Sequence, residues 1–246
     1  MAMGRHLSVV TGGLLVVLIG VIFGHSFFNV DLGPFPVTID RVLWAWLIIA
    51  SIALVISGRS EPKPLNRTDL LVIALALLLI ASTLLHDWRY KDNLPLSRLL
   101  FFNLIPMGFY FVARHTEIKT KHLKVFYLVF AVFGVYLSVT AILEQRGMHA
   151  LVFPQFIIDP QHWEFMGRAR GPLLNPVSCG IYLILSMAAA AFLWTRAHPL
   201  GRVTLGLVVL SCLMASFLTL TRSVWLSCLV AAGILCWLPT RTHIRG

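Results

Sequence analysis

Long apolar stretches separated by short polar segments make up most of this chain of 246 residues. A helix that crosses a bilayer needs about 20 mostly apolar residues, because the hydrocarbon core is about 30 Å thick and a helix rises about 1.5 Å per residue. Eight stretches approach that length, and we predict a transmembrane helix over each of residues 7–28, 40–57, 70–86, 96–113, 123–143, 176–195, 203–220 and 222–238. The predicted fold class is therefore all-α, a polytopic helical membrane protein with one transmembrane domain over residues 1–246.

The ends of several spans carry recognisable signals. The run from Val203 to Leu238 is too long for one crossing, and Thr219–Ser223 is its only polar break, so we predict a turn there. Because that break lacks Gly and Pro, a long tilted helix followed by a re-entrant segment is the alternative. Asn175 and Pro176 suit the N-cap and the first position of the sixth span. Pro106 is the one clear helix breaker inside a span.

Composition agrees with a membrane protein. Hydrophobic residues make up 58% of the chain and charged residues 12%, whereas soluble domains carry about 25% charged residues. The net charge is +10, and the basic residues lie in short loops between spans. This placement indicates that they set the orientation in the membrane, and it does not indicate a nucleic-acid partner. The four cysteines lie in apolar segments without metal-binding spacing, so we expect small core residues, no metal and no cofactor.

Basic residues also predict the orientation. With the N-terminus in the cytoplasm, twelve Lys and Arg residues fall in inner segments and eight in outer segments, as the positive-inside rule favours. Both termini are then cytoplasmic, and the longest loop, residues 144–175, is on the outer side. Its apolar and aromatic residues predict a segment that lies in the membrane interface; these are Phe153, Phe156, Ile157, Ile158 and Trp163.

The outer arginines need an explanation other than membrane insertion. Arg168 and Arg170 stand two apart before Gly171-Pro172, and proline disfavours a helical residue in front of it. We therefore expect an extended segment in which both guanidinium groups point the same way. A helix start facing outward would add unpaired N–H groups and the positive end of its dipole, which together favour an anion. The alternative is that these arginines reach lipid head groups and serve as anchors.

A second group of polar residues interrupts the apolar run at Leu218–Trp225, with the sequence LTLTRSVW. Arg222 begins the eighth span between Thr221 and Ser223, and a guanidinium fork suits phosphate oxygens. The two outward helix starts therefore predict one shared anion site, with an interfacial arginine that stabilises a tight turn as the alternative. His162 and Glu164, close to Arg168, are the acid–base candidates of this face, although a loop histidine is more often merely solvated.

Together, R-x-R-G-P-x-x-N-P-x-x-x-G over Arg168–Gly180 and L-T-x-T-R-S over Leu218–Ser223 resemble the motifs of the O-antigen ligase/polymerase superfamily. The resemblance implies a protein of the bacterial inner membrane that takes a polyprenyl-diphosphate-linked glycan donor at the outer face and transfers it to an acceptor hydroxyl on a glycan, lipid or protein. It implies that the arginines hold the leaving diphosphate without a metal, and it does not distinguish Arg168 from Arg170. The residues it implicates are Arg168, Arg170 and Arg222, supported by Gly171, Asn175, Thr221 and Ser223.

Members of that superfamily also carry a large outer loop and further spans after this region, with a functional histidine and another arginine. This chain ends at Gly246, so we expect it to hold the donor-binding portion. Catalysis then requires a second chain, unless His162 or Glu164 acts as the base, or the protein is a truncated or inactive form. The alternative from another class is a non-catalytic transporter subunit or lipid-binding scaffold. Spans nearly free of charge argue against a path through the bilayer.

Overall fold

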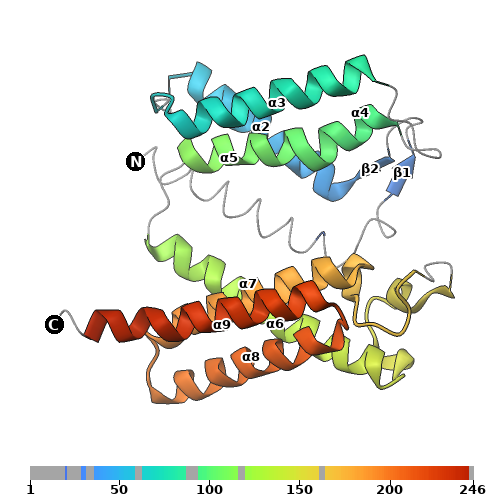
Figure 1. Cartoon of the computed structure of the whole chain (residues 1–246), viewed down its shortest axis with the longest axis vertical. Coiled ribbons are helices and arrows are strands. Elements are labelled where there is room, and N and C mark those ends of the chain that lie inside the picture. The colour runs from blue at the N-terminus through green and yellow to red at the C-terminus, as the bar shows by residue number, and fades with distance from the viewer. Residues whose placement is uncertain are drawn as a thin grey trace. The chain divides into compact units, whose positions relative to one another are not determined.

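The computed structural model describes residues 20, 29–31, 36–58, 63–86, 94–115, 120–160 and 164–243, and the chain divides into two compact units. The first predicted span, residues 7–28, lies almost wholly outside the described residues. A small antiparallel hairpin joins β1 (Asn29–Asp31) to β2 (Pro36–Thr38). All other described elements are helical (Figure 1), which confirms the helical fold class in its broad form.

The first unit contains three helical runs that match the predicted spans at 40–57, 70–86 and 96–113. They are α2 (Ile39–Ile56), α3 (Arg67–Leu85), and a continuous run made of α4 (Pro95–Arg98), η1 (Leu99–Leu104) and α5 (Ile105–His115). Asn66 caps α3 because its side chain accepts the N–H of Asp69 at 2.9 Å. The side chain of Asp69 in turn accepts the N–H of Asn66, which completes a capping box.

The run that contains Pro106 is not interrupted by it. Proline lacks an N–H donor, and its ring would clash with the carbonyl group four residues earlier. The six residues of η1 have π-helical geometry, and the N–H of Ile105 donates to the carbonyl oxygen of Leu100. Widening the turns just before Pro106 therefore accommodates the proline inside one continuous span.

The second unit is built from α6 (Thr120–Gln145), α7 (Pro176–Trp194), α8 (Pro199–Leu218) and α9 (Arg222–His243), which run alongside one another (Figure 1). They match the predicted spans at 123–143, 176–195, 203–220 and 222–238. The turn at Thr219–Thr221 separates helices of 20 and 22 residues. The predicted turn is thus confirmed.

Five described helical runs are long and apolar enough to cross a membrane: residues 67–85, 95–114, 122–145, 176–194 and 199–218. Residues 41–53 and 222–235 form shorter apolar helices. The chain is therefore a multi-pass membrane protein by helix length and composition. Small side chains allow its helices to approach closely, since a Cβ on Gly134 of α6 would lie 2.5 Å from the Cβ of Ser186 and 2.8 Å from the Sγ of Cys212.

The loop between α6 and α7, residues 146–175, has a small core of its own. It contains the short helices η2 (His149–Leu151), η3 (Gln155–Ile158) and η5 (Gly171–Leu173). Ile157 is fully buried and Phe156 and Ile158 are half-buried, while Phe153 is 57% exposed. Ile157 is thus shielded from solvent, and Trp163 lies outside the described residues, so the placement of this segment in the interface stays a prediction.

Candidate functional site

A backbone hydrogen bond brings the two sequence motifs together. The N–H of Ala169, between the two arginines, donates to the carbonyl oxygen of Leu218 at 3.0 Å. Leu218 is the last residue of α8, directly before the turn that leads to Arg222. The segment around Arg168 and Arg170 therefore rests on the α8–α9 turn.

Arg168 and Arg170 have opposite environments. Arg168 is exposed, whereas Arg170 is 2% exposed. The Arg170 guanidinium donates to the carbonyl oxygen of Glu164 at 2.7 Å and to that of Ile157 at 2.5 Å. The expectation that both side chains point the same way is wrong, because Arg170 has φ −118° and ψ −20° rather than extended backbone. Arg170 thus holds the α6–α7 loop together from inside.

Glu144 is a residue of this site that the sequence analysis missed. Its Oε1 accepts the N–H of Gly171 at 2.9 Å, and its Oε2 accepts the N–H of Arg170 at 3.2 Å. Burial lowers the pKa of the Arg170 guanidinium from its usual value, and the Glu144 carboxylate opposes that shift. The signal in the sequence that could have found it is a carboxylate placed at the end of an apolar span.

The start of α7 is capped by its own sequence. Asn175 Oδ1 accepts the N–H groups of Val177 at 2.9 Å and Ser178 at 3.2 Å, and Pro176 occupies the first helical position. This confirms the predicted N-cap. The prediction of unpaired N–H groups is wrong for this helix. Pro176 has no N–H group, and the Asn175 side chain accepts the N–H groups of the next two residues. The first turn of α7 is left with its helix dipole alone as an attraction for an anion.

The start of α9 is different. Thr221 precedes the helix, but its hydroxyl donates to the carbonyl oxygen of Thr219 at 2.9 Å. Within the described part of the chain, the N–H groups of Arg222, Ser223 and Val224 meet no hydrogen-bond acceptor. Free backbone donors therefore occur at α9, where an anion can use them.

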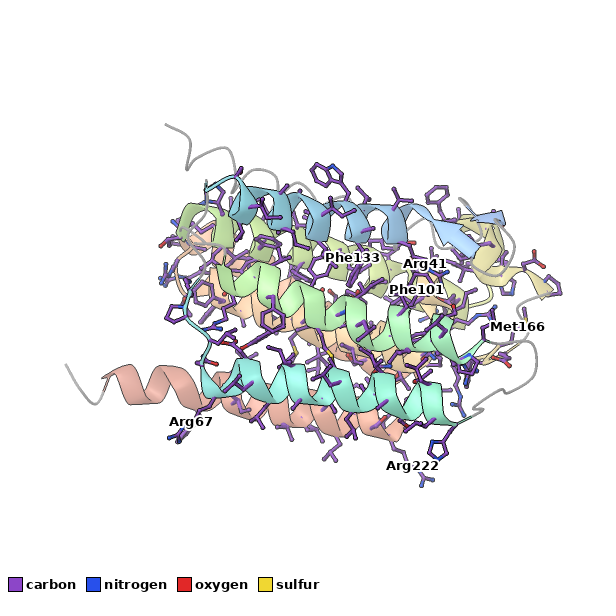
Figure 2. The ribbon with its side chains drawn as sticks, turned by 90° about the horizontal axis from the view of Figure 1, so that it is seen from above. Arg41, Arg67, Phe101, Phe133, Met166 and Arg222 are labelled. Atoms are coloured by element: carbon purple, nitrogen blue, oxygen red, sulfur yellow. The ribbon has the colours of Figure 1, made fainter. Side chains whose placement is uncertain are left out.

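Arg168 and Arg222 supply the charge at this junction. Arg222 is exposed and points away from the ribbon at the first residue of α9 (Figure 2). Among residues 120–160 and 164–243, neither guanidinium has a hydrogen bond or an ion pair. Arg222 lies at the positive end of α9, and Arg168 adjoins the residue whose N–H bonds to Leu218. Exposed guanidinium groups suit an anion with several oxygens, because each fork can bind two of them.

Arg41, which the predicted orientation places on the outer side, has a packing explanation. The Arg41 guanidinium of α2 lies 3.8 Å from the ring centroid of Phe101 in η1 (Figure 2), a cation–π contact. Of the acid–base candidates, Glu164 has an exposed side chain, and its backbone carbonyl oxygen accepts a hydrogen bond from the Arg170 guanidinium. His162 lies outside the described residues. Among the described ranges, no group of three or more His, Cys, Asp or Glu side chains could hold a metal ion.

Comparison with protein-family models, with curated proteins and with solved structures gives no match to this chain. The two motifs and the geometry of their junction are therefore the features that point to a function. That geometry can bind a multivalent anion at one end of the α6–α9 bundle.

Proposed function

We propose that this protein binds a polyprenyl-diphosphate-linked glycan at the outer face of a bacterial inner membrane, as the superfamily it resembles does. The hydrogen bond from Ala169 to Leu218 carries the proposal, because it joins the two motifs whose arginines would share one diphosphate. A lipid-linked ligand reaches such a site from the membrane, and the α6–α9 bundle contains three of the five helices suited to cross it.

The roles of the residues follow from their exposure. Arg168 and Arg222 are exposed and would contact the diphosphate oxygens. The N–H groups at the start of α9 would add donors on the same side. Arg170 is buried and holds the loop, and Asn175 caps α7. Arg168 is therefore preferred over Arg170 as the ligand contact.

In the transfer reaction, the oxygen of an acceptor hydroxyl forms a bond to the sugar carbon, and the bond from that carbon to the diphosphate oxygen breaks. Negative charge then collects on the departing diphosphate, where Arg168 and Arg222 would stabilise it. The acceptor proton needs a base. Glu164 and His162 are the candidates of this chain, and a second chain that supplies the base is the alternative.

Ligand binding by arginine variants tests the proposal. The purified full chain is placed in phosphatidylcholine nanodiscs and titrated with farnesyl diphosphate, a short polyprenyl diphosphate. We expect Arg168→Gln and Arg222→Gln each to raise Kd about tenfold, which corresponds to about 1.4 kcal/mol. The matched control is Arg146→Gln, which removes an exposed arginine at the start of the same loop but outside both motifs.

An unchanged Kd in Arg168→Gln and Arg222→Gln would contradict the proposal, and so would two other outcomes. An equal loss in all three variants would indicate general attraction between cations and phosphate. Equal displacement of the probe by phosphatidylglycerol would indicate head-group anchoring. A loss confined to Arg168→Gln and Arg222→Gln, with no competition from phosphatidylglycerol, is the result expected for a diphosphate site.

A further inference from the structure

Glu144 occupies a costly position at the end of α6. It is the residue before the last in that helix, where the negative end of the helix dipole disfavours a carboxylate. Its side chain is also partly buried, and burial penalises a charge that is not hydrogen-bonded. The charge is offset there by the two N–H donors from Arg170 and Gly171.

Those two donors converge because of the backbone conformation at Arg170–Gly171. Arg170 lies in the right-handed helical region, and Gly171 has φ +56° in the left-handed region. Two successive residues in this arrangement form a concave pair of N–H groups that binds anions. A side chain at Gly171 would be strained at that φ, and its Cβ would lie 3.4 Å from Cys179 Sγ and Leu137 Cδ2. The Glu144 carboxylate is the anion that this pair binds.

The bound backbone leads directly to the exposed arginine. The N–H groups of Gly171 and Arg170 donate to the Glu144 carboxylate. The N–H of Ala169 donates to the carbonyl oxygen of Leu218, and the N–H of Arg168 donates to the carbonyl oxygen of Phe165 at 3.2 Å. Four successive N–H groups are thus held in place while the Arg168 side chain remains exposed. Glu144 is connected to Arg168 through main-chain atoms alone.

We propose that Glu144 is a positioning residue that presents Arg168 to the ligand by fixing the Arg170–Gly171 backbone. This inference rests on the proposed diphosphate site. The carboxylate is occupied by two backbone donors and does not itself contact the diphosphate. Its effect on binding is therefore carried by Arg168, and it disappears when Arg168 is absent.

A double-mutant cycle tests this coupling in the full chain, in the same nanodiscs and with farnesyl diphosphate. Glu144→Gln keeps the shape of the side chain, but its NH2 group cannot accept a hydrogen bond, so one of the two N–H donors loses its acceptor. We expect it to raise Kd about fivefold when Arg168 is present and less than twofold in the Arg168→Gln background. Gln145→Ala is the matched control, since this neighbouring side chain is exposed and forms no hydrogen bond to the described residues of the loop.

Amide hydrogen exchange of the same variants distinguishes a local change in the loop from general unfolding. We expect faster exchange in peptides covering 168–171 of Glu144→Gln, with unchanged protection of α7. An equal loss of affinity in both backgrounds, no loss in either, or exchange that rises across the whole bundle would overturn the inference. If Arg168→Gln itself leaves Kd unchanged, the proposed function fails first, so the two failures are distinguishable.

Discussion

Gly180 shows how closely two helices of the second unit approach at a single residue. A Cβ at this position of α7 would lie 2.4 Å from both methyl carbons of Val224 on α9. Gly180 is also the last residue of the first motif, and Val224 follows the second motif directly. The two motifs therefore meet through a backbone hydrogen bond at one point and through a close glycine contact at another.

We expect Gly180→Ala to destabilise the protein by about 1–3 kcal/mol, because the added methyl group forces α7 and α9 apart. Gly233→Ala on α9 is the matched control: nothing lies within 4 Å of its Cβ position, so it is neutral or stabilises by up to about 1 kcal/mol. Val224→Ala combined with Gly180→Ala should recover part of the loss. Thermal unfolding in detergent measures the effect, and equal behaviour of the two glycine variants would contradict the expectation.

Interactions between residues that lie close together along the chain were predictable from the sequence. The Asn175 cap was predictable, since the cap and its two N–H partners lie within three residues. The separate roles of Arg168 and Arg170 were not, because they depend on the positive φ of Gly171 and on Glu144, which lies 26 residues from Arg170. Of the two helix starts predicted to face outward, α7 has its first N–H groups capped by Asn175, whereas those of α9 stay free because the hydroxyl of Thr221 bonds to Thr219.

At the scale of elements, a buried cluster ties the start of α3 to the end of α5 in the first unit. Asp69 is fully buried and forms an ion pair with Arg114. Asp69 also accepts hydrogen bonds from Tyr110 at 2.9 Å and from the N–H of Asn66 at 2.6 Å. Arg114 donates onward to the carbonyl oxygen of Pro64 at 2.7 Å. One carboxylate therefore fixes the relative register of two helices.

Asp69→Asn should destabilise the first unit by about 2–3 kcal/mol, because it leaves the Arg114 guanidinium, 16% exposed, without its counter-charge. The measurement is hydrogen exchange of peptides from α3 and α5. Thr68→Ala, at an exposed neighbouring position, is the control and should change exchange little. Equal protection in the two variants would show that the cluster does not hold the helices together.

Most helices were predictable because apolar length alone decides where a span can lie. All seven predicted spans within the described residues coincide with helical runs, with ends that differ by a few residues. The π-helical turns before Pro106 were not predicted. Proline indicates a disturbance, but whether the helix breaks, bends or widens depends on what packs around it.

At the scale of the whole molecule, the ends of the helices agree, unit by unit, with the predicted grouping of loops on two sides of the membrane, and which side is cytoplasmic stays a prediction. In the first unit, Lys63 and Arg114 lie at one end, since Lys63 Nζ donates to the carbonyl oxygen of Arg114 at 2.8 Å. Both belong to segments assigned to the cytoplasm. In the second unit, the α6–α7 loop and the α8–α9 turn meet through Ala169 and Leu218. Both of these segments are assigned to the outer side.

Cysteine labelling tests that orientation, with eight spans and both termini in the cytoplasm. In a chain whose four native cysteines are replaced by alanine, Glu164→Cys should react with an impermeant maleimide in intact cells. Lys63→Cys and Arg196→Cys should react only after permeabilisation. All three positions are exposed. Labelling of Glu164→Cys and Arg196→Cys from the same side would overturn the topology.

The hydrogen bond between Ala169 and Leu218 also bears on how such a protein can change over evolutionary time. It uses only main-chain atoms, so exchange of the Leu218 side chain leaves it intact, and position 169 must merely avoid proline and remain small enough for a buried site. The junction therefore places few demands on the identity of either residue. Relatives can differ at both of these positions and still bring the two segments together.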